Sequence, residues 1–118
     1  METLIEVKKR ELENGIMVFD FSGELDETNA DKTFTSIYEM IGDFSKKKIG
    51  FNLLWLKYLN SKSIGYIADV FSNLEDNNGK MCIYQCDDGV KDVLELVGIT
   101  TIIPTFESEK EALESLSV

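Results

Sequence analysis

The chain has 118 residues, of which 43% are hydrophobic and 10% aromatic, and its net charge at neutral pH is −10. This length and composition predict one folded domain over residues 1–118 and exclude a disordered chain. The 22 acidic and 12 basic residues argue against binding to nucleic acid or to an anionic membrane surface, because both require clustered cations.

The sequence carries no recognisable targeting signal and no histidine. No apolar run approaches the ~20 residues of a membrane span, and residues 1–11 carry charges where a signal peptide needs its apolar stretch. We therefore expect a cytoplasmic protein. Histidine is absent, which removes the commonest general base and most zinc sites. We expect no catalytic residue, no metal and no cofactor.

The first elements along the chain are a hairpin and a helix. Residues 3–12 predict an irregular strand, Asn14-Gly15 a tight turn, and residues 16–21 the returning antiparallel strand. Residues 23–30 predict a polar turn into a helix that ends at Gly42. The apolar positions that recur at helical spacing in this helix are Ala30, Phe34, Ile37 and Ile41.

A strand and a helix follow. Residues 49–56 are almost continuously apolar, which is typical of a strand covered on both faces in a parallel sheet. The next helix begins near Ser61 and ends at residues 77–79. Its inward stripe is Ile64, Ile67, Ala68, Phe71 and Leu74. At 100° per residue, Tyr66 lies ~130° from the centre of this stripe, so Tyr66 and Val70 are expected to face outward.

The last third of the chain continues the alternation. Residues 80–86 predict a strand whose Cys82 and Cys86 lie ~13 Å apart, too far for a disulfide, so both are expected to be inert core or half-buried thiols. A short helix ends at Gly98. Residues 101–106 predict an edge strand, because Pro104 cannot donate to a neighbouring strand. Ser108-EKE-Glu111 fits a capping box that opens a terminal helix.

The order of these elements predicts the α/β class. Repeated alternation of strand and helix implies a mostly parallel sheet of about five strands with about four helices, and the hairpin adds an antiparallel N-terminal edge strand. The basic run at residues 46–48 precedes the central strand. It is expected to be a solvated loop rather than a phosphate-binding patch.

The junction Asn60-Ser61-Lys62-Ser63 admits two explanations. An Asn or Ser side chain there can cap the following helix, which is worth ~1 kcal/mol, and capping alone is the favoured reason for these residues. The same place is the carboxyl end of a central strand, where open α/β sheets build their sites. A helix N-terminus also stabilises a phosphoryl group. The junction is thus a cap, a phosphorylation switch, or both.

Three motifs resemble those of the STAS domain, the fold of bacterial anti-sigma factor antagonists. The turn at residues 23–26 is similar to the G-E-L-D of the family. Residues 58–65, YLNSKSIG, are similar to its hydrophobic-hydrophobic-D-S-[ST]-G-[LI]-G motif. Residues 93–106 and 108–113 resemble its closing helix, strand and S-x-x-E-A-L helix. Each motif is short, but together they cover nearly the whole chain in the right order.

The resemblance implies a binding protein rather than an enzyme. In the family, the serine aligned with Ser61 is phosphorylated by an anti-sigma factor that is also a kinase, and phosphorylation weakens the binding between the two. The resemblance also implies a phosphatase that removes the phosphate and restores binding. It leaves a weak homodimer as an open alternative. Asp26 is expected near Ser61. The residues expected to contact the partner are Glu24, Asp26, Asn60, Ser61, Lys62, Ser63, Tyr66 and Val70.

Two departures from the family motif keep other functions open. Asn60 stands in place of an aspartate and Ser63 in place of a glycine. A STAS-like scaffold, or a module of a sensory complex that binds without being phosphorylated, is therefore the alternative. An enzyme is disfavoured, since no phosphate-binding glycine motif is present and an Asp26–Ser61 pair is more often a cap or switch. Lys62, at a helix start that disfavours cations, is expected to be solvated rather than to pair with a phosphate on Ser61.

Overall fold

Strands and helices alternate along the chain after an opening hairpin. The structure is a computed structural model that describes residues 2–118, so residue 1 of the expected domain lies outside the described residues. The strands are β1 (Ile5–Glu11), β2 (Ile16–Leu25), β3 (Lys48–Leu59), β4 (Lys80–Tyr84) and β5 (Thr105–Phe106). The helices are α1 (Ala30–Ile41), α2 (Ser61–Asp76), α3 (Asp88–Leu96) and α4 (Glu109–Leu116), with short 3₁₀ turns η1 (Glu13–Gly15) and η2 (Ile99–Thr101).

The strands form one mixed sheet in the order β1-β2-β3-β4-β5. β1 pairs with β2 in antiparallel fashion, and the remaining neighbours are parallel. The predicted fold class is therefore confirmed, with β3 at the centre and β5 at an edge. The hairpin turn also lies where predicted, since Asn14 and Gly15 both adopt positive φ angles.

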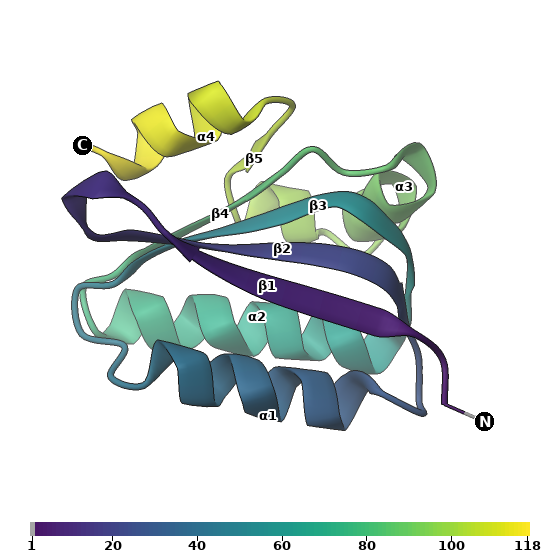
Figure 1. Cartoon of the computed structure of the whole chain (residues 1–118). Coiled ribbons are helices and arrows are strands. Elements are labelled where there is room, and N and C mark those ends of the chain that lie inside the picture. The colour runs from purple at the N-terminus through teal and green to yellow at the C-terminus, as the bar shows by residue number, and fades with distance from the viewer. Residues whose placement is uncertain (1) are drawn as a thin grey trace.

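The sheet separates two unequal layers of helices. Apolar residues of α1, α2 and α3 share a core with one face of the sheet, while α4 lies alone on the other face (Figure 1). Beneath α4, Ala112 and Leu116 pack with residues at the amino-terminal end of β2 and with Cys82 and Tyr84 of β4. We call the α4 side the outer face of the sheet. Only part of this face is covered by α4.

β3 is less completely buried than its composition predicts. Leu53 is fully buried, but Leu54 and Trp55 are exposed, so the expectation that this strand is covered on both faces holds only for its first half. The physical reason is the shortness of α4, which has eight residues and extends over only part of the sheet.

The boundaries of other strands also differ from the prediction. β2 continues to Leu25, so residues 23–25 are strand rather than turn. The Glu24 N–H donates to the Leu4 carbonyl at 3.0 Å, and Gly23 has a φ of +119°. A Cβ at Gly23 would lie 2.4 Å from the Leu4 oxygen, which explains why this motif begins with glycine.

The edge strand is shorter than predicted. Residues 101–104 form the end of η2 and a bend, and only Thr105 and Phe106 pair with β4. Pro104 lacks an N–H, but its carbonyl still accepts a hydrogen bond from Ile83. β4 likewise ends at Tyr84 instead of residue 86. Cys82 is buried and Cys86 half-buried, as predicted, and both are free thiols.

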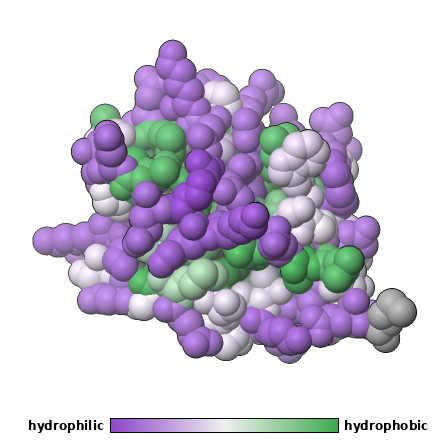
Figure 2. Space-filling model, in the orientation of Figure 1, coloured by the Kyte–Doolittle hydropathy of each residue, from purple (hydrophilic) through white to green (hydrophobic). Residues whose placement is uncertain are grey.

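Figure 2 shows that the surface on the side of β1 is mostly hydrophilic, with smaller hydrophobic areas between charged side chains. Among residues 2–118, no helix is both long enough and apolar enough to cross a lipid bilayer.

Candidate functional site

Asn60 organises the junction between β3 and α2. Its Oδ1 accepts a hydrogen bond from the Ser63 backbone N–H at 2.9 Å and another from the Ser63 hydroxyl at 2.7 Å. Asn60 is therefore the N-cap, and Ser61 is the first residue of the helix with an exposed side chain. The predicted position of Ser61, in the first helical turn and accessible, is confirmed.

Ser63 does not lie on the surface. Its side chain is fully buried and its hydroxyl points back to Asn60, so the expectation that it contacts a partner is wrong. An N-cap side chain accepts a hydrogen bond from the backbone N–H of the third helical residue, which here is Ser63. The same Asn60 oxygen also accepts from the Ser63 hydroxyl, which therefore needs no solvent partner. Serine thus fits where the family motif has glycine, without a positive φ angle.

Asp26 lies at the same end of the sheet as Ser61. Leu25 pairs with Leu59, and the Asn60 N–H donates to the Leu25 carbonyl at 3.0 Å. The residues that follow these paired ends are therefore neighbours, which confirms the predicted placement.

The Asp26 carboxylate stabilises the turn between β2 and α1 through hydrogen bonds. It accepts hydrogen bonds from the Thr28 hydroxyl at 2.6 Å, from the Thr28 N–H at 2.9 Å and from the Thr3 hydroxyl. The Thr28 and Thr3 hydroxyls hold the pKa of Asp26 below its ordinary value, so the group is ionised at neutral pH. Its partners are Thr3 and Thr28 rather than Ser61, and it does not activate the serine.

Asn29, which sequence reasoning missed, completes this turn. Its side-chain amide donates to the carbonyls of Thr3 at 2.8 Å and Glu24 at 2.9 Å, and its Oδ1 accepts from the Asp26 N–H at 3.0 Å. The side chain is almost completely buried. The available signal was an asparagine directly before the apolar period of α1, a position typical of a structural cap.

Tyr66 faces α1 rather than solvent. Its ring stacks on Phe34, with centroids 4.9 Å apart and planes inclined by 10°, and its hydroxyl donates to Asp31 at 2.5 Å. The expectation of an outward tyrosine is therefore wrong. The reason is tertiary: α1 lies along the flank of α2, so that flank is covered as well as the face on the sheet (Figure 1).

Lys62 forms an ion pair with the carboxylate of Asp31 at 2.9 Å. The Tyr66 hydroxyl and, secondly, the Lys62 ammonium lower the pKa of Asp31, while Asp31 raises the pKa of Lys62. Lys62 and Asp31 are both at the surface, where such a pair contributes little to stability. Lys62 is thus at the surface, as expected, although it already has a partner.

Val70 is fully buried, so its predicted place on the partner surface is wrong. Ala68 and Phe71, expected in the core, are only partly buried. The buried stripe of α2 is Ser63, Ile64, Ile67, Val70 and Leu74. The helix is rotated relative to the predicted stripe, which was chosen from hydrophobicity alone. Glu24, Ser61 and Lys62 remain exposed at this end of the molecule.

Most of the chain matches one family. The family model of the STAS domain matches residues 7–112. The chain belongs to the STAS domain family. A relative named "Anti-sigma F factor antagonist", from Paenibacillus polymyxa, is 26% identical over 104 residues, which are 88% of this chain and 89% of the relative.

Solved structures share the fold of this STAS domain. An anti-sigma factor antagonist from Mycobacterium paratuberculosis superposes with a TM-score of 0.86 at 18% identity, covering 98% of this chain and 96% of the other. The Bacillus cell fate determinant SpoIIAA in its phosphorylated form gives a TM-score of 0.70 at 18% identity, covering 93% and 98%. The resemblance found in the sequence is thereby confirmed.

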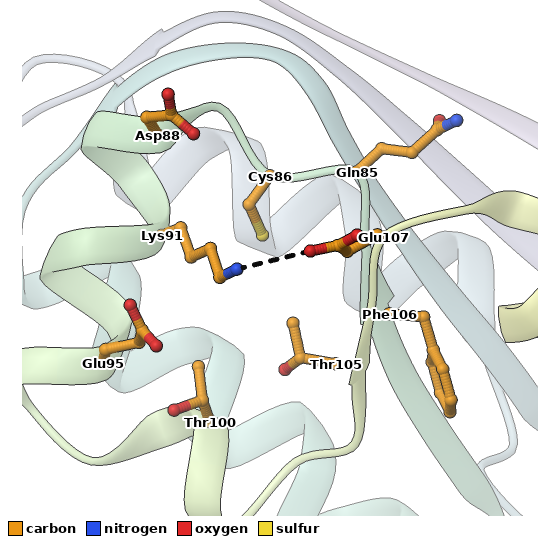
Figure 3. A pocket seen from close by; sticks show the side chains of 9 residues that line it. All are labelled: Gln85, Cys86, Asp88, Lys91, Glu95, Thr100, Thr105, Phe106 and Glu107. Atoms are coloured by element: carbon orange, nitrogen blue, oxygen red, sulfur yellow. Dashed lines mark ion pairs between the residues drawn. The ribbon is translucent and has the colours of Figure 1, made fainter.

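The STAS domain also has a hollow of about 460 Å³ between α3 and β5, which the sequence did not predict (Figure 3). Lys91 and Glu107 face each other across it, with their charged atoms 3.8 Å apart. Cys86 points into it, but burial raises the pKa of its thiol to about 11, so it is protonated at neutral pH. The lining offers no activated nucleophile. Within residues 2–118, no three metal-ligating side chains gather to hold an ion.

Proposed function

We propose that this STAS domain is an anti-sigma factor antagonist that is switched off when Ser61 is phosphorylated. Its partner would be an anti-sigma factor that is also a serine kinase, and a phosphatase would restore the active form in the cytoplasm. The observation that carries the proposal is the position of Ser61. Its side chain is exposed at the first residue of α2, directly after the central strand.

The names of related proteins support this assignment. The Paenibacillus polymyxa relative is an antagonist by name, and the Bacillus protein of the same fold is described in a phosphorylated form. In the proposed reaction the Ser61 Oγ forms a bond to the γ-phosphorus of ATP. The bond from that phosphorus to the bridging oxygen breaks, ADP leaves, and the hydroxyl proton passes to a base of the kinase.

The switch would act through charge. A phosphate adds about −1.5 to −2 charges, and Glu24 and Asp31 are already exposed acids at this end of the domain. The free N–H groups of the first turn of α2 would stabilise the phosphate. A partner surface complementary to the neutral serine would then face an added dianion. Asn60 keeps the turn in place with an uncharged acceptor, which supports a functional junction despite the missing aspartate.

The test uses the kinase-type anti-sigma factors encoded in the same genome. Incubation of the chain with each factor and Mg-ATP, followed by mass spectrometry, should give one phosphate on Ser61. Calorimetric titration should show Ser61→Asp binding at least tenfold more weakly than the unmodified chain, a loss of about 1.4 kcal/mol. Ser72→Asp, which places the same charge on an exposed position of α2, is the matched control and should bind normally.

Two results would contradict the proposal. Phosphate on Ser63 or Ser72 instead of Ser61 would refute the assignment of the switch. Tight binding without any modification, unaffected by Ser61→Asp, would favour the scaffold that acts without phosphorylation.

A further inference from the structure

The outer face of the sheet bears three exposed apolar side chains close to the Ser61 end. The exposed fractions are 39% for Leu54, 60% for Trp55 and 51% for Tyr58. We call these three residues the Trp55 surface. Single exposed apolar residues are common, but a contiguous group on one strand marks an interaction site more often.

Strand pairing places the two aromatic residues on the outer face. Trp55 pairs with Ser22 and Tyr58 with Glu24, both of which are exposed. Phe21, directly before Ser22, and Leu25, directly after Glu24, are buried in the opposite core. Helix α4 packs on the other half of this face (Figure 1), and none of the three residues of the Trp55 surface belongs to the cluster beneath it.

The strand itself is irregular where it presents these side chains. Between the pairs Asp20–Asn52 and Ser22–Trp55, β3 contains one residue more than β2, and a second extra residue follows before Tyr58. Such bulges turn side chains toward a new direction and are common beside functional sites. β4 accompanies β3 only as far as Asn52, which leaves the following residues of β3 without that neighbour.

Charge selects the kind of molecule that would cover this surface. Two acids, Glu6 (paired with Ser22) and Glu24, border the Trp55 surface on one side. On the other side lies Asp87, whose Oδ1 forms an ion pair with the Lys57 Nζ at 3.3 Å. The Lys57 ammonium lies 5.5 Å from the centre of the Trp55 ring. A second copy of this chain, with a net charge of −10, would bring acids against acids, and an anionic membrane would be repelled in the same way. A protein with an apolar recess bordered by Lys or Arg is complementary.

We propose that the Trp55 surface is a second part of the contact with the anti-sigma factor, and that a basic-rimmed apolar recess of that factor receives Trp55. The inference rests on the proposed function. Tyr58 precedes Ser61 by three residues on the same segment, so the aromatic contact and the phosphorylation site are continuous. The aromatic side chains would anchor the complex, and the phosphoserine would act at its margin.

The experiment uses the anti-sigma factor that the kinase test identifies. Trp55 is the only tryptophan of the chain, so replacing it biosynthetically with 5-hydroxytryptophan gives a probe that can be excited selectively. Its emission should shift to shorter wavelength when the factor is added. In calorimetric titrations, Trp55→Ser should bind at least tenfold more weakly than the original chain. Leu96→Ser, which removes an apolar side chain that is 86% exposed on α3, should bind normally.

The outcomes separate this inference from the proposed switch. If Ser61→Asp binds weakly while Trp55→Ser binds normally and the emission stays unchanged, the inference is wrong and the switch stands. If Trp55→Ser binds weakly and Ser61→Asp binds normally, the surface is correct and the switch is wrong. The emission of the original chain does not depend on whether a variant folds. Sedimentation tests the remaining occupant. If the original chain self-associates, Trp55→Ser abolishes this association, and the emission does not shift when the factor is added, the surface binds a second copy and the inference is overturned.

Discussion

Replacing Asn60 by alanine removes one oxygen that serves two donors. The backbone N–H of Ser63 loses its cap, a loss of ~1 kcal/mol in comparable helices. The Ser63 hydroxyl, fully buried, also loses its acceptor, and an unsatisfied buried polar group costs ~1–3 kcal/mol. Since a hydroxyl can rotate toward a helix carbonyl, the lower end applies. Asn60→Ala should therefore reduce the free energy of unfolding by about 2 kcal/mol, or roughly 8 °C in Tm.

Three further variants isolate the cause. Asn60→Asp keeps an oxygen at the same place and restores the residue of the family motif, so its stability should lie within ~0.5 kcal/mol of the original chain. Ser63→Ala in the Asn60→Ala background removes the stranded hydroxyl. The double variant should therefore be no less stable than Asn60→Ala, whereas Ser63→Ala alone should destabilise the original chain by ~1 kcal/mol.

Urea unfolding at neutral pH, followed by circular dichroism, measures the stability of all five proteins, the original chain and its four variants. The slope of each transition shows whether the same surface is exposed. Equal stability of Asn60→Ala and the original chain would refute the reasoning. So would an Asn60→Asp variant as unstable as Asn60→Ala, because the stabilising feature would then not be the acceptor oxygen.

Two other predictions concern the α1–α2 contact and the support of α4. Tyr66→Ala should lower the free energy of unfolding by about 2 kcal/mol, because it removes the ring stacked on Phe34. Tyr66→Phe keeps the stacked ring and should lose less than ~1 kcal/mol. Equal urea midpoints for Tyr66→Ala and the original chain would contradict this prediction. Glu109 accepts a hydrogen bond from Arg10 at 2.6 Å, which holds the pKa of Glu109 below its ordinary 4.5. A carboxylate whose pKa is lowered by folding stabilises the fold above its unfolded pKa and loses that contribution as pH falls. The urea midpoint should therefore drop when the pH is lowered below 4.5, and Glu109→Gln should show a smaller drop; equal drops for the two proteins would exclude Glu109 as the cause.

The local elements of this protein were determined by short stretches of its sequence. The apolar period that begins at Ala30 and the stop at Gly42 gave α1 its two ends. The Ser108 side chain accepts from the Glu111 N–H, as the capping box predicted. Cap chemistry and hydrophobic period act within a few residues, so they can be recognised without knowing the fold. The exposed place of Ser61 after the central strand followed from the same local signals.

The tertiary structure alone decided which flanks of these elements are covered. Val70 is buried within the stripe that α2 turns to the core, and Tyr66 stacks on Phe34 because α1 packs beside α2. Conversely, Trp55 and Tyr58 are exposed on a strand whose sequence predicts burial on both faces, because α4 starts beside Tyr84 and runs away from them, over the first residues of β3 (Figure 1). Hydrophobicity shows that a side chain gains free energy by leaving water. Whether another element is present to receive it depends on the lengths and packing of segments far away in the chain.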